Sequence, residues 1–179
     1  MNVEPRESAV LLLLYPKHDA LHFVLTRRAE RLGHHSGQIS LPGGRVDPDD
    51  VDVAATALRE TREELGIALD GIDMLGQLSE LYVPPSNFVI RPVVAHVPIA
   101  PEFVPNADEV AEIIEAPTSI LLDANIRGSS LRKLVSQSGR VVVTPHYLIE
   151  GHIVWGATAM ILSEFEAVLW RTEDAKMSR

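Results

Sequence analysis

The segment that most constrains the fold is residues 52–66, which read DVAATALRETREELG. Its apolar residues recur at the three- and four-residue spacing of one helical face. Asp52 can cap the start of such a helix, because its side chain can accept a hydrogen bond from an unpaired backbone N–H group, and Gly66 suits the left-handed position that often ends one. The segment therefore predicts a helix over residues 52–65 with an apolar side to bury.

Strand patterns surround this helix. Residues 21–28 show the two-residue period of a half-buried strand. We also expect strands at 9–15, 73–82 and 88–97, a hairpin over 140–156 and a C-terminal helix over 158–170. Residues 129–137 are weakly helical, and residues 108–116 fit a strand or a helix. Because strands and helices intermix, we expect a single layered domain of the α+β or α/β class over residues 1–179.

Charge and cysteine content exclude several classes of protein. A formal net charge of −9 argues against a nucleic-acid partner, whose phosphates require clustered Lys and Arg. The chain has no cysteine, which excludes disulfides, thiolate metal sites and a cysteine nucleophile. The sequence has neither an apolar run long enough to span a membrane nor a basic secretory leader, so we expect a cytoplasmic protein with no membrane partner.

Carboxylates gather at the end of the expected helix. Glu60, Glu63 and Glu64 share one surface of it, and their mutual repulsion is offset only in part by Arg59 and Arg62. A bound cation would relieve that repulsion, and oxygen ligands without Cys or paired His indicate a hard ion, Mg²⁺ or Mn²⁺. The alternative is a solvent-exposed helix face carrying Glu–Arg ion pairs.

The sequence around these glutamates resembles a known signature. PGG at residues 42–44 followed by RETREELGI at 59–67 is similar to the pattern of the Nudix hydrolases, G-x5-E-x7-R-E-U-x-E-E-x-G-U, where U is apolar. The matching positions are Arg59, Glu60, Glu63, Glu64, Gly66 and Ile67. Thr61 replaces an apolar residue, and the interval from Gly44 to Arg59 is one residue longer than in the pattern. The first glutamate of the signature therefore falls on Asp50 or Val51, depending on the direction of counting.

Residues 25–44 resemble, more specifically, the coenzyme A pyrophosphatase branch of that family, which also has the longer interval. The matching positions are Thr26, Arg27 or Arg28, His35, Gly37, Gln38, Pro42, Gly43 and Gly44. The resemblance implies the Nudix fold, an α/β/α sandwich whose mixed β-sheet is flanked by helices. It also implies metal-dependent hydrolysis of coenzyme A, or of an acyl or oxidised form, to 3′,5′-ADP and 4′-phosphopantetheine.

Roles for individual residues follow from the resemblance. Glu60 and Glu64 are expected to be the principal ligands of Mg²⁺ or Mn²⁺, with Glu63 as an auxiliary ligand or base and Arg59 as their orienting partner. The residues expected to contact the substrate are Arg27, Arg28, Gln38, Gly43 and Gly44. His35 is expected to orient its loop, and Glu112 is a candidate for a further ligand or base from outside the helix.

Two other functions stay open at this point. The enzyme could act on a different nucleoside diphosphate compound, such as ADP-ribose, NADH or a nucleoside triphosphate. The fold could also serve as a binding module without turnover, although such a module does not need a repulsive carboxylate cluster. A homodimer is one of the oligomeric states that the sequence allows.

Overall fold

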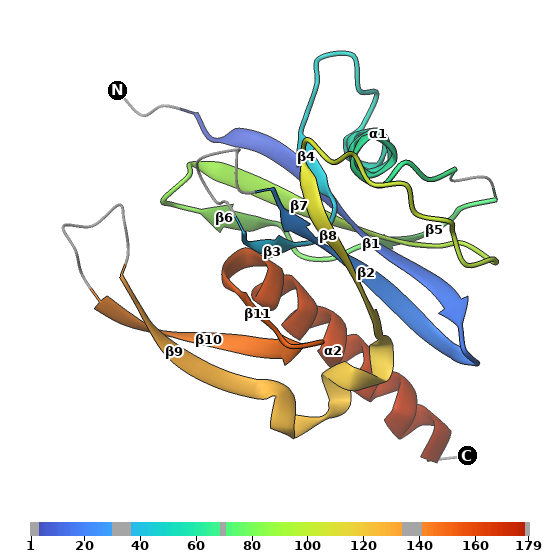
Figure 1. Cartoon of the computed structure of the whole chain (residues 1–179), viewed down its shortest axis with the longest axis vertical. Coiled ribbons are helices and arrows are strands. Elements are labelled where there is room, and N and C mark those ends of the chain that lie inside the picture. Colours follow the sequence, from blue (N-terminus) through green and yellow to red (C-terminus); the bar gives the residue numbers. More distant parts are fainter. Residues whose placement is uncertain (1–3, 30–36, 69–70, 134–140, 178–179) are drawn as a thin grey trace.

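Two β-sheets and two α-helices form the layers of the protein (Figure 1). The structure is a computed structural model of the chain, and it describes residues 4–29, 37–68, 71–133 and 141–177. Helix α1 (Val53–Leu65) covers one face of the larger sheet, and helix α2 (Gly156–Met177) lies on its other face, beside the smaller sheet. This arrangement confirms the expected α+β sandwich with a mixed sheet between helices.

The larger sheet has eight strands, with the order β3-β2-β1-β7-β5, while β4, β6 and β8 pair with β1, β7 and β2. It is mixed because β1 and β7 run parallel and the other pairs are antiparallel. Its strands are β1 (Arg6–Lys17), β2 (Ala20–Arg28), β3 (Ile39–Ser40), β4 (Gly43–Arg45), β5 (Asp73–Gln77), β6 (Leu81–Val83), β7 (Phe88–His96) and β8 (Val110–Pro117).

The smaller sheet follows two short 3-10 helices, η2 (Thr118–Leu122) and η3 (Ala124–Ile126). Its strands, in the order β11-β10-β9, are β9 (Arg127–Lys133), β10 (Val141–Ile149) and β11 (His152–Trp155). The hairpin expected at 140–156 is therefore confirmed, and it turns at Glu150 and Gly151, both of which have positive φ. No helix in the described ranges is long and apolar enough to cross a membrane.

The central strands are buried on both faces. In β1, Leu11 and Leu13 pack in the core beneath α1, whereas Leu12 and Leu14 pack in the core beneath α2. The strand expected at residues 21–28 is confirmed as β2, but its central residues are buried on both faces, so the expected half-burial is wrong. A period of two predicts one buried face only when the other face meets water, and here a helix covers each face.

Two segments differ from the expected secondary structure, and a third, which fitted a strand or a helix, is a strand. Residues 129–137 were expected to be weakly helical, but residues 127–133 form strand β9, because β10 supplies a hydrogen-bonded partner along that strand. The single strand expected at 73–82 is wrong, since β5 and β6 are separate strands that both pair with β7. Residues 108–116, which fitted either state, contribute strand β8.

Candidate metal and phosphate site

Helix α1 begins and ends as its sequence predicts. The Asp52 carboxylate accepts a hydrogen bond of 2.7 Å from a backbone N–H in the first turn. Gly66 ends the helix with a φ of 62°, and its N–H donates to the carbonyl of Arg62. Thr61, at the position that is usually apolar in the signature, is fully buried and satisfies its hydroxyl by donating to the carbonyl of Ala57 at 2.7 Å. The polar residue is thus accommodated without an unpaired group.

Strand β4 brings two glycines against the glutamates of α1. The Gly43 N–H donates to Glu64 Oε2 at 3.1 Å. A Cβ on Gly43 would lie 2.3 Å from the Ala9 carbonyl oxygen of β1, so only glycine fits here. A Cβ on Gly44 would lie 2.3 Å from Glu60 Oε2, which shows that the Glu60 carboxylate rests directly against the Gly44 backbone. Four of the residues expected from the sequence therefore meet at one place.

Arg59 holds the acidic residues around it in place. Its Nε and Nη2 atoms donate to the two oxygens of Asp50, each at 3.0 Å. Its Nη1 atom donates to Glu60 at 2.8 Å and to Glu63 at 3.2 Å. The Glu63 side chain is 54% exposed, against 17% for that of Glu60. Arg59 thus links Asp50 to two of the glutamates, and Glu63 lies at the outer edge of the cluster.

Both carboxylate oxygens of Asp50 bind Arg59. Besides Arg59, its carboxylate accepts hydrogen bonds from the Thr56 hydroxyl at 2.8 Å and from the Asp47 N–H at 2.9 Å. The bonds from Arg59 are the main reason that the pKa of Asp50 lies well below its usual range. Of the two positions where the first glutamate of the signature could fall, Asp50 binds Arg59. The other, Val51, is 90% exposed and makes no contact with the cluster.

Glu64 is the most buried of the three glutamates. Its side chain is 7% exposed, and this burial raises the pKa of its carboxyl to about 8. The nearby charges of Glu60 and Glu109 raise the pKa further, whereas the Gly43 N–H and the positive charge of Arg28 lower it. Burial also raises the pKa of Glu60, against the lowering effect of Arg59. Negative charge at this position is therefore unfavourable without a cation.

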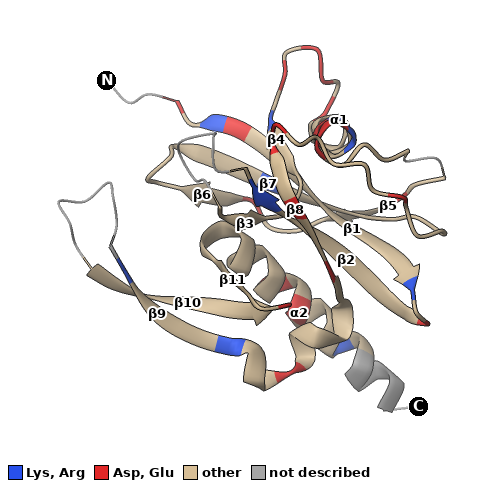
Figure 2. Ribbon diagram, viewed as in Figure 1, with Lys and Arg blue, Asp and Glu red and all other residues tan. Residues whose placement is uncertain are grey.

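A divalent metal ion fits these residues. The groups available as metal ligands are carboxylate oxygens, which Mg²⁺ and Mn²⁺ prefer. The negative charge of the buried Glu64 is only partly balanced by the positive charge of Arg28. Acidic residues also line α1 and the loop before it (Figure 2). In the described ranges, no three His, Asp or Glu side chains already stand in a ligating arrangement. Glu60 and Glu63 are instead turned toward Arg59.

A fourth glutamate, Glu109, belongs to this cluster. Its charge raises the pKa values of both Glu60 and Glu64. The loop before β8 is bound to the end of α1, because the Asn106 N–H donates to the Glu64 carbonyl at 2.9 Å and Asn106 Nδ2 donates to Glu109 at 3.3 Å. The candidate expected from outside the helix was Glu112, which contacts Arg27 instead.

The two arginines at the end of β2 act on different acidic groups. The positive charge of Arg28 lowers the pKa of Glu64. Arg27 follows the alternation of Phe23 and Leu25, which pack on the α2 side. It donates to Glu112 Oε2 at 2.7 Å, and this accounts for the position of Glu112 away from the α1 glutamates.

Gln38 lies beside this strand end, with its carbonyl accepting a hydrogen bond of 3.0 Å from the Arg28 N–H. It therefore helps to place the two arginines through its backbone. His35, expected to orient the same loop, lies outside the described residues.

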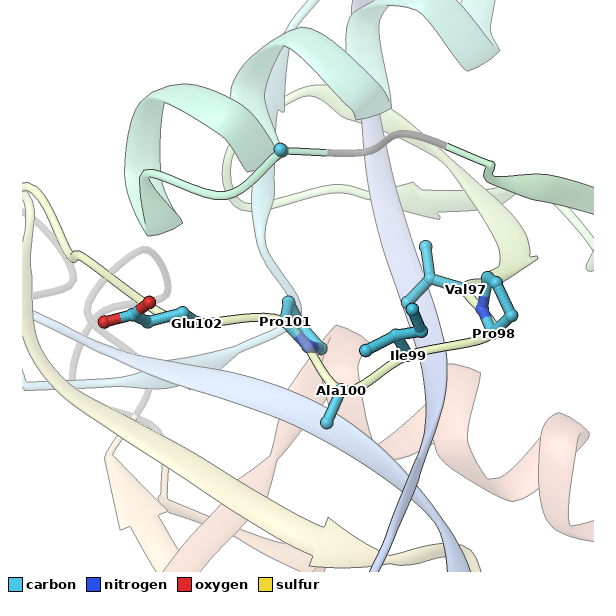
Figure 3. Close-up of a pocket in the computed structure, with 7 residues that line it drawn as sticks. Val97, Pro98, Ile99, Ala100, Pro101 and Glu102 are labelled. Carbon is cyan, nitrogen blue, oxygen red and sulfur yellow. The ribbon is translucent and has the colours of Figure 1, made fainter.

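A cavity of about 280 Å³ lies beside the residues that follow α1 (Figure 3). Its lining consists of Ala68 and residues 97–102, which supply apolar side chains and one carboxylate, that of Glu102. None of these seven residues is basic, so the cavity does not suit an anionic ligand. The glutamate cluster, and not this cavity, is the candidate site.

Comparison with known proteins gives a consistent result. Residues 5–127 match a family model described as NUDIX domain. The chain is 39% identical over 165 residues to human mitochondrial coenzyme A diphosphatase NUDT8, an alignment that covers 90% of this chain and 68% of that protein. It is 38% identical over 162 residues to the Nudix hydrolase NudL of Photorhabdus laumondii, with 89% and 82% covered.

Solved structures support the fold. A Nudix hydrolase from M. smegmatis, RenU, superimposes with a TM-score of 0.56 at 23% identity, over 68% of this chain and 76% of that one. A MutT/nudix family protein from Enterococcus faecalis gives a TM-score of 0.58 at 19% identity, over 94% of this chain and 64% of that one.

Proposed function

Since the chain belongs to the Nudix hydrolase family, we propose that it hydrolyses the diphosphate of coenzyme A, or of an acyl or oxidised form, to 3′,5′-ADP and 4′-phosphopantetheine. The observation that carries this proposal is the contact of Glu60 and Glu64 with the backbone of Gly43 and Gly44, which puts carboxylate oxygens beside a donor N–H group. Similarity to a relative named as a coenzyme A diphosphatase supports the choice of substrate.

Each residue of the cluster has a proposed part in the reaction. Glu60 and Glu64 hold a divalent ion, Mg²⁺ or Mn²⁺, with Glu63 as an auxiliary ligand. When bound, this ion neutralises charge on the diphosphate and lowers the pKa of a bound water. Arg59 orients Glu60 and Glu63, and Asp50 in turn fixes Arg59 through both carboxylate oxygens.

The remaining groups act on the substrate and on the attacking water. Arg28, whose positive charge lowers the pKa of Glu64, would attract a diphosphate oxygen that approaches this glutamate. Gly43 and Gly44 let the proposed metal ligands lie against the backbone, because the Gly43 N–H donates to Glu64 and the Glu60 carboxylate fills the space beside Gly44. Glu109 is the candidate for the base that accepts a proton from the water, because it approaches Glu60 and Glu64 from outside α1.

The first experiment is incubation of the protein with coenzyme A and Mg²⁺, or Mn²⁺, with chromatographic detection of 3′,5′-ADP. Product from the wild type and none from Glu64→Gln would support both the substrate and the metal helix. If the wild type releases no product with either ion, the coenzyme A proposal fails. ADP-ribose, NADH and nucleoside triphosphates would then be tested with the same pair of proteins.

Glu109→Gln separates a base from a passive neighbour. The substitution keeps the shape and removes the proton acceptor, so kcat is expected to fall about 100-fold or more while the KM for coenzyme A changes little. Glu115→Gln is the matched control, because Glu115 lies further along β8 and binds Tyr15 and Lys17 instead. Equal activities of the two variants would exclude Glu109 as the base.

Membership of the Nudix hydrolase family argues against a non-catalytic binding module, and turnover of any nucleoside diphosphate compound would exclude it. The cytoplasmic location and the homodimer stay predictions. The human relative is named as mitochondrial.

A further inference from the structure

We propose that Arg27, positioned by Glu112 and His152, recognises a phosphate monoester of the substrate that is separate from the diphosphate. In coenzyme A this group is the 3′-phosphate of the ribose. The inference rests on the proposed function for the identity of the substrate. It makes Arg27 a specificity-determining residue, and it makes Glu112 and His152 positioning residues.

The first step concerns the different partners of the two arginines at the end of β2. Arg27 and Arg28 are the last two residues of this strand, and Arg27 is held by Glu112 of β8 rather than by a glutamate of α1. The diphosphate is proposed to bind at the α1 glutamates, so we assign to Arg27 an anion that is a different group of the ligand. Because both arginines stand at a strand end, one ligand that passes this end can reach both of them.

The second step is the set of contacts that holds Arg27. The Glu112 carboxylate accepts from Arg27 Nε at 2.7 Å through Oε2. Its other oxygen, Oε1, lies 3.4 Å from Nε2 of His152 on β11. Arg27, Glu112 and His152 thus form a line from the larger sheet to the smaller one. Two anchored neighbours reduce the rotamer freedom that Arg27 would otherwise lose when it binds a ligand.

The third step concerns the nitrogen atoms of the Arg27 guanidinium that Glu112 does not bind. Glu112 binds the Nε side, and the two terminal Nη atoms form the edge that pairs best with two phosphate oxygens. The Arg27 side chain is 32% exposed, so part of it is accessible to a ligand. A partly exposed arginine that is held through Nε can offer its two Nη atoms to a phosphate in a bidentate contact.

A purely structural latch between the two sheets would use the same three residues. The two explanations differ in what they predict for ligands with and without the monoester. A latch would affect both ligands equally, because it acts through the fold. Direct recognition would affect only the ligand that carries the additional phosphate.

The test measures binding of 3′,5′-ADP and of 5′-AMP, which differ only in the 3′-phosphate, by calorimetry in the presence of Mg²⁺. Arg27→Gln is expected to weaken binding of 3′,5′-ADP about 10- to 100-fold, the range for a charged hydrogen-bonded pair, and to leave 5′-AMP unchanged. Glu112→Gln should act in the same direction by about 3- to 10-fold, and Arg27→Lys should restore only part of the affinity. Arg28→Gln, at the residue proposed to attract the diphosphate, is the matched control and should weaken both ligands alike.

The same variants are then assayed with coenzyme A and with 3′-dephospho-coenzyme A. Arg27→Gln should raise the KM for coenzyme A alone, with kcat nearly unchanged. Equal effects on the two members of each pair, or no effect, would overturn the recognition of the monoester. Absence of turnover in the wild type would refute the proposed function, while the binding measurements would still decide the role of Arg27.

Discussion

Glu64→Gln is expected to make the metal-free protein more stable at alkaline pH. Burial raises the pKa of Glu64 to about 8 in the folded chain, from an ordinary value of 4.5. Between these two values the folded state holds a proton that the unfolded state has released. Stability therefore falls as pH rises through this interval. Glutamine has the same shape, can still accept the Gly43 N–H bond, and has no proton to release.

The size of the effect follows from the same two values. The wild type loses about 1.4 kcal/mol for each pH unit in the interval, which sums to an upper limit of about 5 kcal/mol. Water that reaches the site screens part of this, so we expect Glu64→Gln to be more stable by roughly 2–3 kcal/mol at pH 9. The two proteins should be nearly equal at pH 5, where folded Glu64 is protonated and neutral.

Urea denaturation with EDTA, repeated at intervals from pH 5 to pH 9, measures this difference. Addition of Mg²⁺ at pH 9 should then stabilise the wild type and leave Glu64→Gln unchanged, because the ion binds only the folded protein that keeps its ligand. A stability difference that is the same at every pH would refute the reasoning, since it would mean that Glu64 is ionised in both states.

Three further substitutions test the geometry around α1. Gly44→Ala would place a Cβ 2.3 Å from the Glu60 carboxylate, so it should displace that flexible group and lower kcat about 10-fold or more with little change in melting temperature, as measured by turnover and calorimetry. Gly66→Ala puts a side chain at a φ of 62° and 2.2 Å from the Val104 carbonyl oxygen, so chemical denaturation should show a loss of about 2 kcal/mol or more. Asp52→Ala removes the N-cap bond and should lower the free energy of unfolding by about 1 kcal/mol, without the loss of kcat expected for Gly44→Ala.

Local signals in the sequence were sufficient for α1. Its period, the capping Asp52 and the terminal Gly66 all act within a few residues, so the expected helix over 52–65 agrees with the observed one at Val53–Leu65. The charge cluster could also be predicted, because residues three and four apart on a helix are necessarily neighbours.

The contacts between residues far apart in the sequence depend on strand pairing, which the sequence did not predict. The contact of Gly43 and Gly44 with the glutamates depends on the register of β4 on β1, which only a resemblance could indicate. The surroundings of Arg27 and Arg28 depend on the end of β2, where its pairing with β8 shifts register between the two residues. The same pairing puts Glu112 beside Arg27, so sequence position alone could not separate it from Glu109.

Strand β1 couples the two halves of this molecule during unfolding. Alternate side chains such as Leu11 and Leu12 belong to the core under α1 and to the core under α2. Neither core can be exposed to solvent while this strand stays in place for the other. We therefore expect the metal helix to unfold in the same cooperative transition as α2, so that a destabilising substitution beneath α2 raises the population of molecules without a metal site.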